Sequence, residues 1–84
     1  MSVTVKDFYA DWCGPCKKQS SIVEELEEEH PEVEIKKIDV DESPDVAQQY
    51  GVRSVPTIVI EKDGEIVEKY IGLTQGDEIA SHFE

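Results

Sequence analysis

The spacing of apolar residues predicts a strand and then a helix at the start of the chain. Residues 3–9 are rich in β-branched and aromatic side chains, which is typical of a strand. From Cys13 to about Glu29 the spacing changes to three and four residues, which predicts an amphipathic helix. The residues that share its predicted inner face are Cys16, Ser20, Ile22, Val23 and Leu26. Pro31 ends the helix, because the residue before a proline is driven out of the helical conformation.

A second strand and a short helix are predicted next. Apolar residues interleave with charged residues between Val33 and Val40, as in a strand. Ser43 is a favourable N-cap and Pro44 is a favourable first helical residue. The helix that they begin should run for about two turns and end at Gly51, a typical residue for that position.

A hairpin is predicted in the following segment. Residues 57–61 are β-branched and nearly all apolar, as expected for a strand that is buried on both faces. Asp63-Gly64 is a strong signal for a tight turn. Residues 65–71 should therefore pair antiparallel with residues 57–61.

The final predicted element is a helix. Thr74 and Asp77 have the spacing of a capping box, and the apolar face of the helix would contain Ile79, Ala80 and Phe83. The full order is βαβαββα, an α/β pattern in which a four-stranded mixed sheet is flanked by three helices. Residues 1–84 are expected to form a single domain, because the chain is shorter than the roughly 100–150 residues of a usual domain.

The excess of acidic residues makes some classes of binding partner unfavourable. Eight Lys and Arg residues against twenty Asp and Glu residues give a net charge of -12. Such a surface disfavours binding to nucleic acid and to anionic membranes. No apolar run approaches the roughly 18 residues that span a bilayer, and the first residues lack the pattern of a secretory signal. We therefore expect a cytoplasmic protein.

Cys13 and Cys16 are the only cysteines and the strongest chemical signal. They lie at the junction of the first strand and the first helix, where α/β proteins tend to place ligands and chemistry. Free N–H groups and the macrodipole at the helix N-terminus favour a thiolate at Cys13, the predicted nucleophile. Cys16, one turn further, is the predicted resolving thiol, and Gly14-Pro15 fixes the loop between the two sulfurs.

The spacing of the cysteines alone leaves three alternatives. A redox-active pair is favoured in a small chain with two cysteines. A zinc site would need His30 and His82 or carboxylates as further ligands, and the sequence has no second cysteine or histidine pair at metal-binding spacing. A purely structural disulfide would close a loop of very few residues and would suit a reducing cytoplasm badly.

Residues 12–17, Trp-Cys-Gly-Pro-Cys-Lys, resemble the thioredoxin family, in which Trp-Cys-Gly-Pro-Cys is a specific signature. Residues 8–10, 37–41, 50–57, 64 and 72 follow in the family's order. The resemblance implies a minimal thioredoxin fold that lacks the family's first strand and helix. It also implies a thiol–disulfide oxidoreductase that reduces protein disulfides through a redox-active Cys13–Cys16 pair. The alternatives are a glutaredoxin-like enzyme that uses a low-molecular-weight thiol, and a zinc-holding or non-catalytic binding module.

The resemblance further implies catalytic roles for two charged residues. Asp7, six residues before Cys13, matches the family's buried carboxylate that takes a proton when the second cysteine attacks. An Asp inside a strand is desolvated, so its pKa should rise, and Lys37 on the neighbouring strand is the expected partner that modulates it. Without the resemblance, an Asp exposed at the edge of the sheet would be the simpler interpretation.

A docking surface for protein substrates is also implied. Pro56 matches the family's proline that follows a cis peptide bond, and Val55 would offer its backbone to an extended substrate segment. A flat, weakly polar patch is expected around an exposed Cys13 sulfur. The other residues of this patch would be Trp12, Gly14, Pro15, Gly72 and Leu73. The alternative is that Trp12 and Leu73 are ordinary, partly buried residues.

No bound cofactor and no metal are expected, because electrons can arrive by exchange from a separate reductase. The expected partners are this thioredoxin reductase-like donor and client proteins that contain disulfides, and the chain is expected to be a monomer. Its acidic composition resembles that of small thioredoxins from salt-loving archaea. Glutamates near the predicted end of the first helix oppose the macrodipole, so salt should stabilise the chain.

Overall fold

Seven elements follow one another in the computed structural model, which describes residues 2–83. The strands are β1 (Val3–Tyr9), β2 (Glu34–Asp39), β3 (Thr57–Lys62) and β4 (Glu65–Ile71). The helices are α1 (Gly14–Glu29), α2 (Pro44–Gln49) and α3 (Gly76–Ala80). The predicted order βαβαββα is therefore confirmed. Met1 and Glu84, which the predicted single domain also includes, lie outside the described residues.

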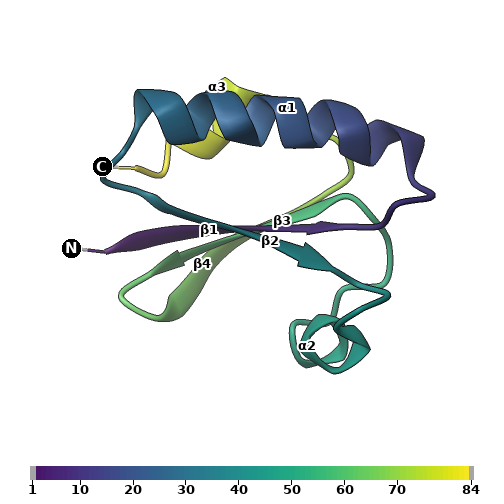
Figure 1. The fold of residues 1–84 in the computed structure, drawn as a ribbon. Helices are drawn as coiled ribbons and strands as arrows, with labels where there is room; N and C mark the ends of the chain where they lie inside the picture. Colours follow the sequence, from purple (N-terminus) through teal and green to yellow (C-terminus); the bar gives the residue numbers. More distant parts are fainter. Residues whose placement is uncertain (1, 84) are drawn as a thin grey trace.

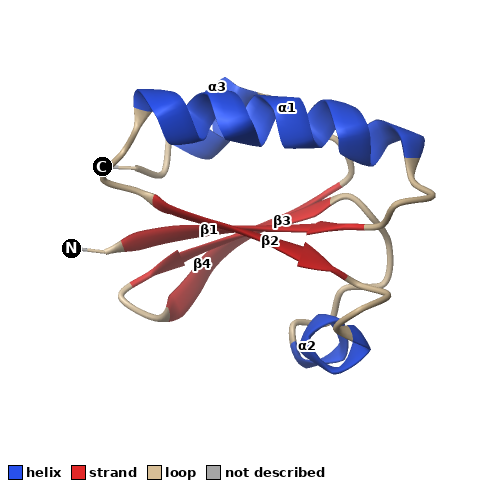
Figure 2. Cartoon of the chain, viewed as in Figure 1, coloured by secondary structure: helices blue, strands red, loops and turns tan. Residues whose placement is uncertain are grey.

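The four strands form one mixed sheet in the order β2-β1-β3-β4. β1 pairs parallel with β2 and antiparallel with β3, and β3 pairs antiparallel with β4. α1 and α3 cover one face of the sheet, and α2 lies on the other face (Figure 1, Figure 2). The predicted four-stranded mixed sheet with three flanking helices is confirmed. None of the helices described between residues 2 and 83 has the length and apolar character needed to span a membrane.

Side chains on the two faces of the sheet form two separate cores. The core under α1 and α3 contains Val3, Val5, Val23, Leu26, Val33, Ile58, Ile60 and Ile79. The smaller core under α2 contains Phe8, Ala47 and Val59. Because side chains alternate along a strand, the odd-numbered residues of β1 face α1 and the even-numbered residues face α2. Residues 57–61 of β3 are all buried, as predicted for a strand covered on both faces.

The turn between β3 and β4 is the predicted hairpin. Asp63 and Gly64 have φ angles of 52° and 85°, so both residues adopt the left-handed conformation. A two-residue turn of this kind matches the twist of the flanking strands, and Asp-Gly is among the sequences that favour it. Lys62 and Glu65 pair across the turn.

Helix α2 begins at the predicted residue and ends at Gln49, with Tyr50 as its C-cap before the predicted Gly51. Ser43 is its N-cap and Pro44 is its first residue. The Ser43 hydroxyl makes no capping hydrogen bond to the backbone of residues 2–83, but its carbonyl oxygen accepts from the Ala47 N–H at 3.2 Å. Gly51 follows the helix with a φ of 67°, a conformation that glycine adopts without a Cβ clash.

Helix α3 does not begin with the predicted capping box. It starts at Gly76 with Gln75 as its N-cap, so the assignment of Thr74 and Asp77 to a capping box is wrong. Thr74 is buried, and its hydroxyl donates to the carbonyl oxygen of Gly72 at 3.0 Å. The Thr74 side chain is used in the preceding turn, and the helix begins one residue later than the capping box would place it.

The last turns of α1 concentrate negative charge. The exposed glutamates there are Glu24, Glu25, Glu27, Glu28 and Glu29. Four pairs among them are spaced three or four residues apart, where like charges on a helix repel one another. The last turn of α1 has no basic residue to balance this charge. The C-terminal end of the helix is therefore destabilised electrostatically.

We expect KCl to raise the melting temperature of the chain. Each repelling pair costs about 0.2–0.5 kcal/mol, and going from 0.1 M to 1 M salt shortens the Debye length from about 10 Å to about 3 Å. Relief of about 1 kcal/mol would raise the melting temperature of a domain of this size by about 4–8 °C. Circular dichroism melting curves would measure the rise. The double variant Glu28→Gln/Glu29→Gln should show a smaller rise, and a flat or falling response of the unmodified chain would contradict the expectation.

Candidate active site

Cys13 and Cys16 meet at the N-terminus of α1. After β1 ends at Tyr9, a backbone hydrogen bond of 3.1 Å from the Cys13 N–H to the Ala10 carbonyl oxygen turns the chain into the helix. Cys13 is the N-cap, and its sulfur accepts a hydrogen bond from the backbone N–H of Cys16 at 3.2 Å. Pro15 has no N–H, so the Cys16 N–H is one of few donors left in this turn. The helix N-terminus therefore points a donor at the Cys13 sulfur.

The two cysteines are joined by a disulfide, with Cα atoms 5.3 Å apart. The structure thus shows the oxidised form of the pair. Both cysteines are buried, with exposed fractions of 5% for Cys13 and 3% for Cys16, and they pack against Ala10 and Val55. The expectation of an exposed Cys13 sulfur is therefore wrong for this form, because the N-cap position turns the sulfur towards the backbone of its own helix.

Asp7 lies in β1 on the face that α1 covers. Its side chain is fully buried, and neither carboxylate oxygen has a hydrogen-bond partner within the part of the chain that the structure describes. Burial raises the pKa of Asp7 from 3.8 to about 6, against the opposing charge of Lys37. The carboxyl group can therefore take up or release a proton close to neutral pH, as a general base must. The alternative of an exposed Asp at the sheet edge is wrong, since β1 is a central strand.

Lys37 lies opposite Asp7 in the register of β1 and β2. Its ammonium group donates to the Ser20 hydroxyl at 2.6 Å and forms an ion pair with the Glu24 carboxylate, and both of these residues belong to α1. Lys37 therefore acts on Asp7 through its charge, which lowers the pKa of Asp7, while its hydrogen bonds go to the helix. Ser20, predicted on the inner face of α1, is half-buried and serves this contact.

Val55 and Pro56 bring a second segment of the chain to the cysteines. The peptide bond between them is cis, as predicted, and Val55 packs against the cluster that contains both cysteines. The Gly72 N–H donates to the Pro56 carbonyl oxygen at 2.9 Å, which holds the segment after β4 beside this loop. Pro56 itself is buried, whereas Val55 and Gly72 are half-buried.

Two large apolar side chains of the predicted patch are exposed. Trp12 has an exposed fraction of 72% and Leu73 one of 40%, so neither is the partly buried residue that the alternative supposed. Gly14 and Pro15 are also exposed. Ile71, which precedes Gly72 and is 73% exposed, is not among the predicted residues. Its position as the last residue of an edge strand leaves it uncovered.

Asp41 and Gln19 also support the site, and the sequence analysis assigned neither. The Trp12 indole N–H donates to the Asp41 carboxylate at 2.9 Å, which fixes the exposed ring. Gln19 is fully buried in α1 and makes two hydrogen bonds to the backbone of Thr74. Its amide N–H donates to the Thr74 carbonyl oxygen at 3.0 Å, and its amide oxygen accepts from the Thr74 N–H at 2.8 Å.

The spacing of Gln19 along α1 was the available signal that this side chain is buried. It lies three residues after Cys16 and four before Val23, on the stripe of α1 that the structure buries. The predicted inner face named the neighbouring Ser20, which is half-buried, and omitted Gln19. A glutamine in register with buried residues indicates a buried hydrogen-bonding role.

His30 and His82 do not join the cysteines. His30 follows the last residue of α1, about 25 Å along the helix from Cys13, and its ring packs edge-on against Phe83. The His82 ring nitrogen lies 2.8 Å from the Tyr70 hydroxyl. A zinc site made of the two cysteines and the two histidines is therefore incompatible with the fold. No group of three or more His, Cys, Asp or Glu side chains in residues 2–83 is arranged to hold a metal ion.

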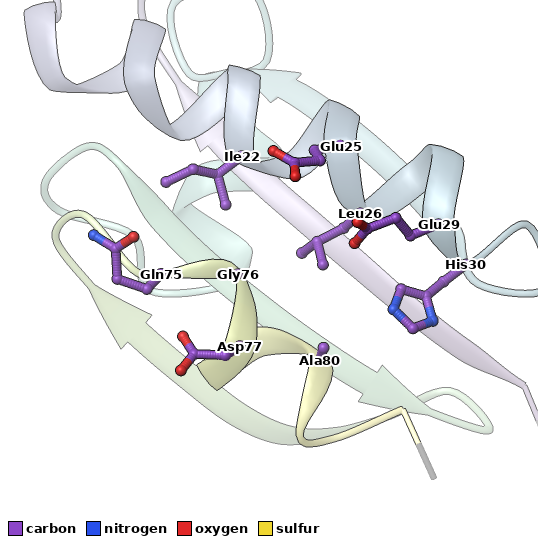
Figure 3. A pocket seen from close by; sticks show the side chains of 9 residues that line it. All are labelled: Ile22, Glu25, Leu26, Glu29, His30, Gln75, Gly76, Asp77 and Ala80. Atoms are coloured by element: carbon purple, nitrogen blue, oxygen red, sulfur yellow. The ribbon is translucent and has the colours of Figure 1, made fainter.

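A groove between α1 and α3 is separate from the cysteine pair (Figure 3). The residues that line it are Ile22, Glu25, Leu26, Glu29, His30, Gln75, Gly76, Asp77 and Ala80. All of its α1 residues come from the C-terminal half of the helix, whereas the cysteines lie at the N-terminus. The groove contains none of the predicted site residues.

Comparisons with known proteins agree with this geometry. The thioredoxin family model matches residues 2–84. The thioredoxin of Chlamydia trachomatis serovar D is 48% identical over 73 residues, which cover 87% of this chain and 72% of that protein. The thioredoxin of Listeria monocytogenes is 45% identical over 78 residues, covering 92% and 76%. Among solved structures, a point mutant of the thioredoxin from Halobacterium salinarum NRC-1 superposes with a TM-score of 0.91 at 46% identity, covering 99% of this chain and 76% of that one.

We expect Asp7→Asn to stabilise the chain at neutral pH. Because the pKa of Asp7 is higher in the folded state, about 6, than its ordinary 3.8, the folded state binds the proton more tightly. The stability of the native chain should therefore fall as pH rises from about 4 to about 6 and stay low above that. The pKa difference corresponds to about 3 kcal/mol at pH 7.5, which the neutral amide avoids.

Urea unfolding at pH 7.5 and at pH 4 would measure this difference. The gain from Asp7→Asn should be large at pH 7.5 and should mostly disappear at pH 4. Asp11→Asn, at an exposed position just after the same strand, is the matched control. An equal effect of Asp7→Asn at both pH values would contradict the burial of an ionised carboxylate.

Proposed function

Because this chain belongs to the thioredoxin family and is a thiol–disulfide oxidoreductase that reduces protein disulfides, we propose that Asp7 is its proton acceptor and Lys37 its modulating partner. The observation that supports this proposal is the position of Asp7. Its buried carboxylate has no hydrogen-bond partner in residues 2–83 and lies beneath the helix that carries Cys13 and Cys16.

The first step uses the reduced protein. The Cys13 thiolate attacks one sulfur of a client disulfide, the client S–S bond breaks, and the other client sulfur leaves as a thiolate. Cys13 is then joined to the client in a mixed disulfide. The N–H of Cys16 and the positive end of the α1 macrodipole stabilise the negative Cys13 sulfur before the attack.

The second step releases the client. Cys16 gives its proton to the Asp7 carboxylate and attacks the Cys13 sulfur, and the second client sulfur leaves as a thiolate. The client disulfide has gained two electrons, and the two cysteines have lost them. The product is the Cys13–Cys16 disulfide, which is the form in the structure. A base with a pKa near 6 can accept the proton and return it to solvent close to neutral pH.

The patch around the cysteines is the proposed docking surface for client proteins. The exposed Trp12 lines one hollow with Val55, and the exposed Leu73 follows Gly72, whose N–H donates to the Pro56 carbonyl oxygen. An extended client segment would take backbone hydrogen bonds from Val55 and apolar contacts from the exposed side chains. Clients of this chemistry are proteins whose disulfide lies in an extended, accessible segment.

The electron donor, the location and the source of the chain are proposed from the chemistry of the disulfide and from the acidic composition. Electrons that reopen the disulfide come by exchange from a separate thioredoxin reductase-like enzyme, and the chain acts as a cytoplasmic monomer without a bound cofactor. The net charge of -12 and the similarity to a Halobacterium salinarum thioredoxin support an origin in a salt-loving archaeon. Bacterial thioredoxins are similar to the same degree, so the composition is the stronger support.

Cys16→Ser should trap client proteins. Without the resolving thiol, Cys13 still forms the mixed disulfide but cannot release it, so a covalent complex with a disulfide protein such as insulin should accumulate. Non-reducing gel electrophoresis would detect the complex, and dithiothreitol should dissolve it. Cys13→Ser is the control and should trap nothing. If Cys16→Ser also traps nothing and the native chain binds zinc one to one, the exchange mechanism is wrong.

Leu73→Asp should weaken the reduction of protein disulfides selectively. A carboxylate in the docking patch would lower kcat/KM for a protein substrate roughly tenfold. The rate with a small uncharged disulfide such as hydroxyethyl disulfide should stay close to that of the native chain. Ile66→Asp replaces a similarly exposed apolar residue, 52% accessible, far along β4 from the cysteines, and should change neither rate. Equal losses with both substrates would count against a docking role for Leu73.

A further inference from the structure

A network of three side chains ties β2 to α1 beside the cysteines. The Lys37 ammonium donates to the Ser20 hydroxyl at 2.6 Å and to the Glu24 carboxylate. The Ser20 hydroxyl also donates to the Glu24 carboxylate at 3.2 Å. Ser20 and Glu24 lie one turn apart on α1, so both reach the same ammonium group. The hydrogen bond from Lys37 lowers the pKa of Glu24, which keeps Glu24 ionised for the contact.

The same ammonium group is the natural partner of Asp7. Lys37 and Asp7 are paired residues on adjacent strands, and both have the odd-numbered position that faces α1. Paired residues of opposite charge on one face attract each other. The Asp7 carboxylate nevertheless accepts no hydrogen bond from any residue between 2 and 83. Two carboxylates therefore compete for one ammonium group, and the structure shows Glu24 as the one that holds it.

We propose that Glu24 and Ser20 are positioning residues for disulfide exchange, which hold the Lys37 ammonium on α1 and so leave the Asp7 carboxylate free to accept the Cys16 proton. The proposal deepens the proposed function, because it rests on Asp7 as the proton acceptor. Neither Glu24 nor Ser20 needs to touch the reacting sulfurs. Both act through Lys37.

Lys37 is the charged side chain through which Glu24 and Ser20 affect the pKa of Asp7. β3 places the uncharged Ile58 opposite Asp7, and burial together with Lys37 accounts for the shifted pKa of Asp7. The titratable or charged groups on this face of the sheet include Tyr9 of β1, Lys37 of β2 and Tyr70 of β4, and α1 adds Cys13, Cys16 and Glu24. The cysteines are joined in the oxidised protein and do not titrate there. The oxidised protein therefore isolates the effect of Lys37.

The test replaces Glu24 and follows Asp7 directly. The carboxyl carbon of Asp7 would be titrated by NMR in the oxidised native chain, in Glu24→Gln and in Glu25→Gln. Glu25 is an exposed neighbour on the same helix and is the matched control for the loss of one negative charge. Glu24→Gln should free Lys37 to turn towards Asp7 and lower the midpoint by about half a pH unit, the scale of an exposed ion pair. Glu25→Gln should lower it much less.

Variants in a chain that already carries Lys37→Met show whether Glu24 shifts the Asp7 midpoint through Lys37. Lys37→Met alone should raise the Asp7 midpoint, because the positive charge that opposes burial is removed. In that background, adding Glu24→Gln should move the midpoint no further than adding Glu25→Gln does. An equal shift from Glu24→Gln and Glu25→Gln in the native background would overturn the proposal, as would a Glu24→Gln shift that persists in full without Lys37.

The pH profile of kcat/KM for a protein disulfide separates this proposal from the proposed function. The acidic limb of the profile should move with the NMR midpoint in each variant. If the NMR midpoint moves in Glu24→Gln but the profile does not, Asp7 is not the proton acceptor and the assigned role in exchange is wrong. If neither moves while Cys16→Ser still traps clients, the exchange mechanism stands and the positioning role of Glu24 and Ser20 is wrong.

Discussion

The central place of β1 in the sheet is the constraint on which the site depends. β1 pairs with β2 on one side and with β3 on the other, so its side chains point alternately to the two covered faces of the sheet. Four residues after β1 the chain begins α1, which runs back over the odd-numbered face of the same strand (Figure 1). Asp7 is therefore covered by the helix whose first turn holds Cys13 and Cys16. Burial of the carboxylate and placement of the cysteines are two results of one arrangement.

The Asp7 carboxylate has no hydrogen-bond partner in residues 2–83, and two other lysines of the sheet are held away from it. Lys6 is held by Glu61 and the Tyr50 hydroxyl on the α2 face of the sheet, and Lys69 donates to backbone carbonyl oxygens at the end of α2. An unpaired buried charge costs folding free energy. The same cost makes the carboxylate a better proton acceptor than an exposed Asp.

Local signals in the sequence were enough for the fold and for the reacting groups. The hairpin follows from Asp63-Gly64, and the resemblance identified Asp7 by its spacing from the cysteines. The interactions that hold the site in shape were not predictable in this way. Gln19 and Thr74 are 55 residues apart, so the spacing of Gln19 on α1 could indicate its burial but not which backbone groups it bonds. The capping box at Thr74 failed because the Thr74 hydroxyl donates to Gly72 within the preceding turn and the Thr74 N–H donates to the distant Gln19.

The Gln19 side chain gives Thr74 what an adjoining strand would give it, an acceptor for its N–H and a donor for its carbonyl oxygen. A carboxylate could only accept and an ammonium group could only donate, whereas a planar amide does both from neighbouring atoms. Asparagine has the same group but is one methylene shorter. The choice of amino acid at this position is therefore restricted by stereochemistry and not by reactivity. A glutamine three residues after the second cysteine can serve as a marker of this loop geometry in sequences for which no coordinates exist.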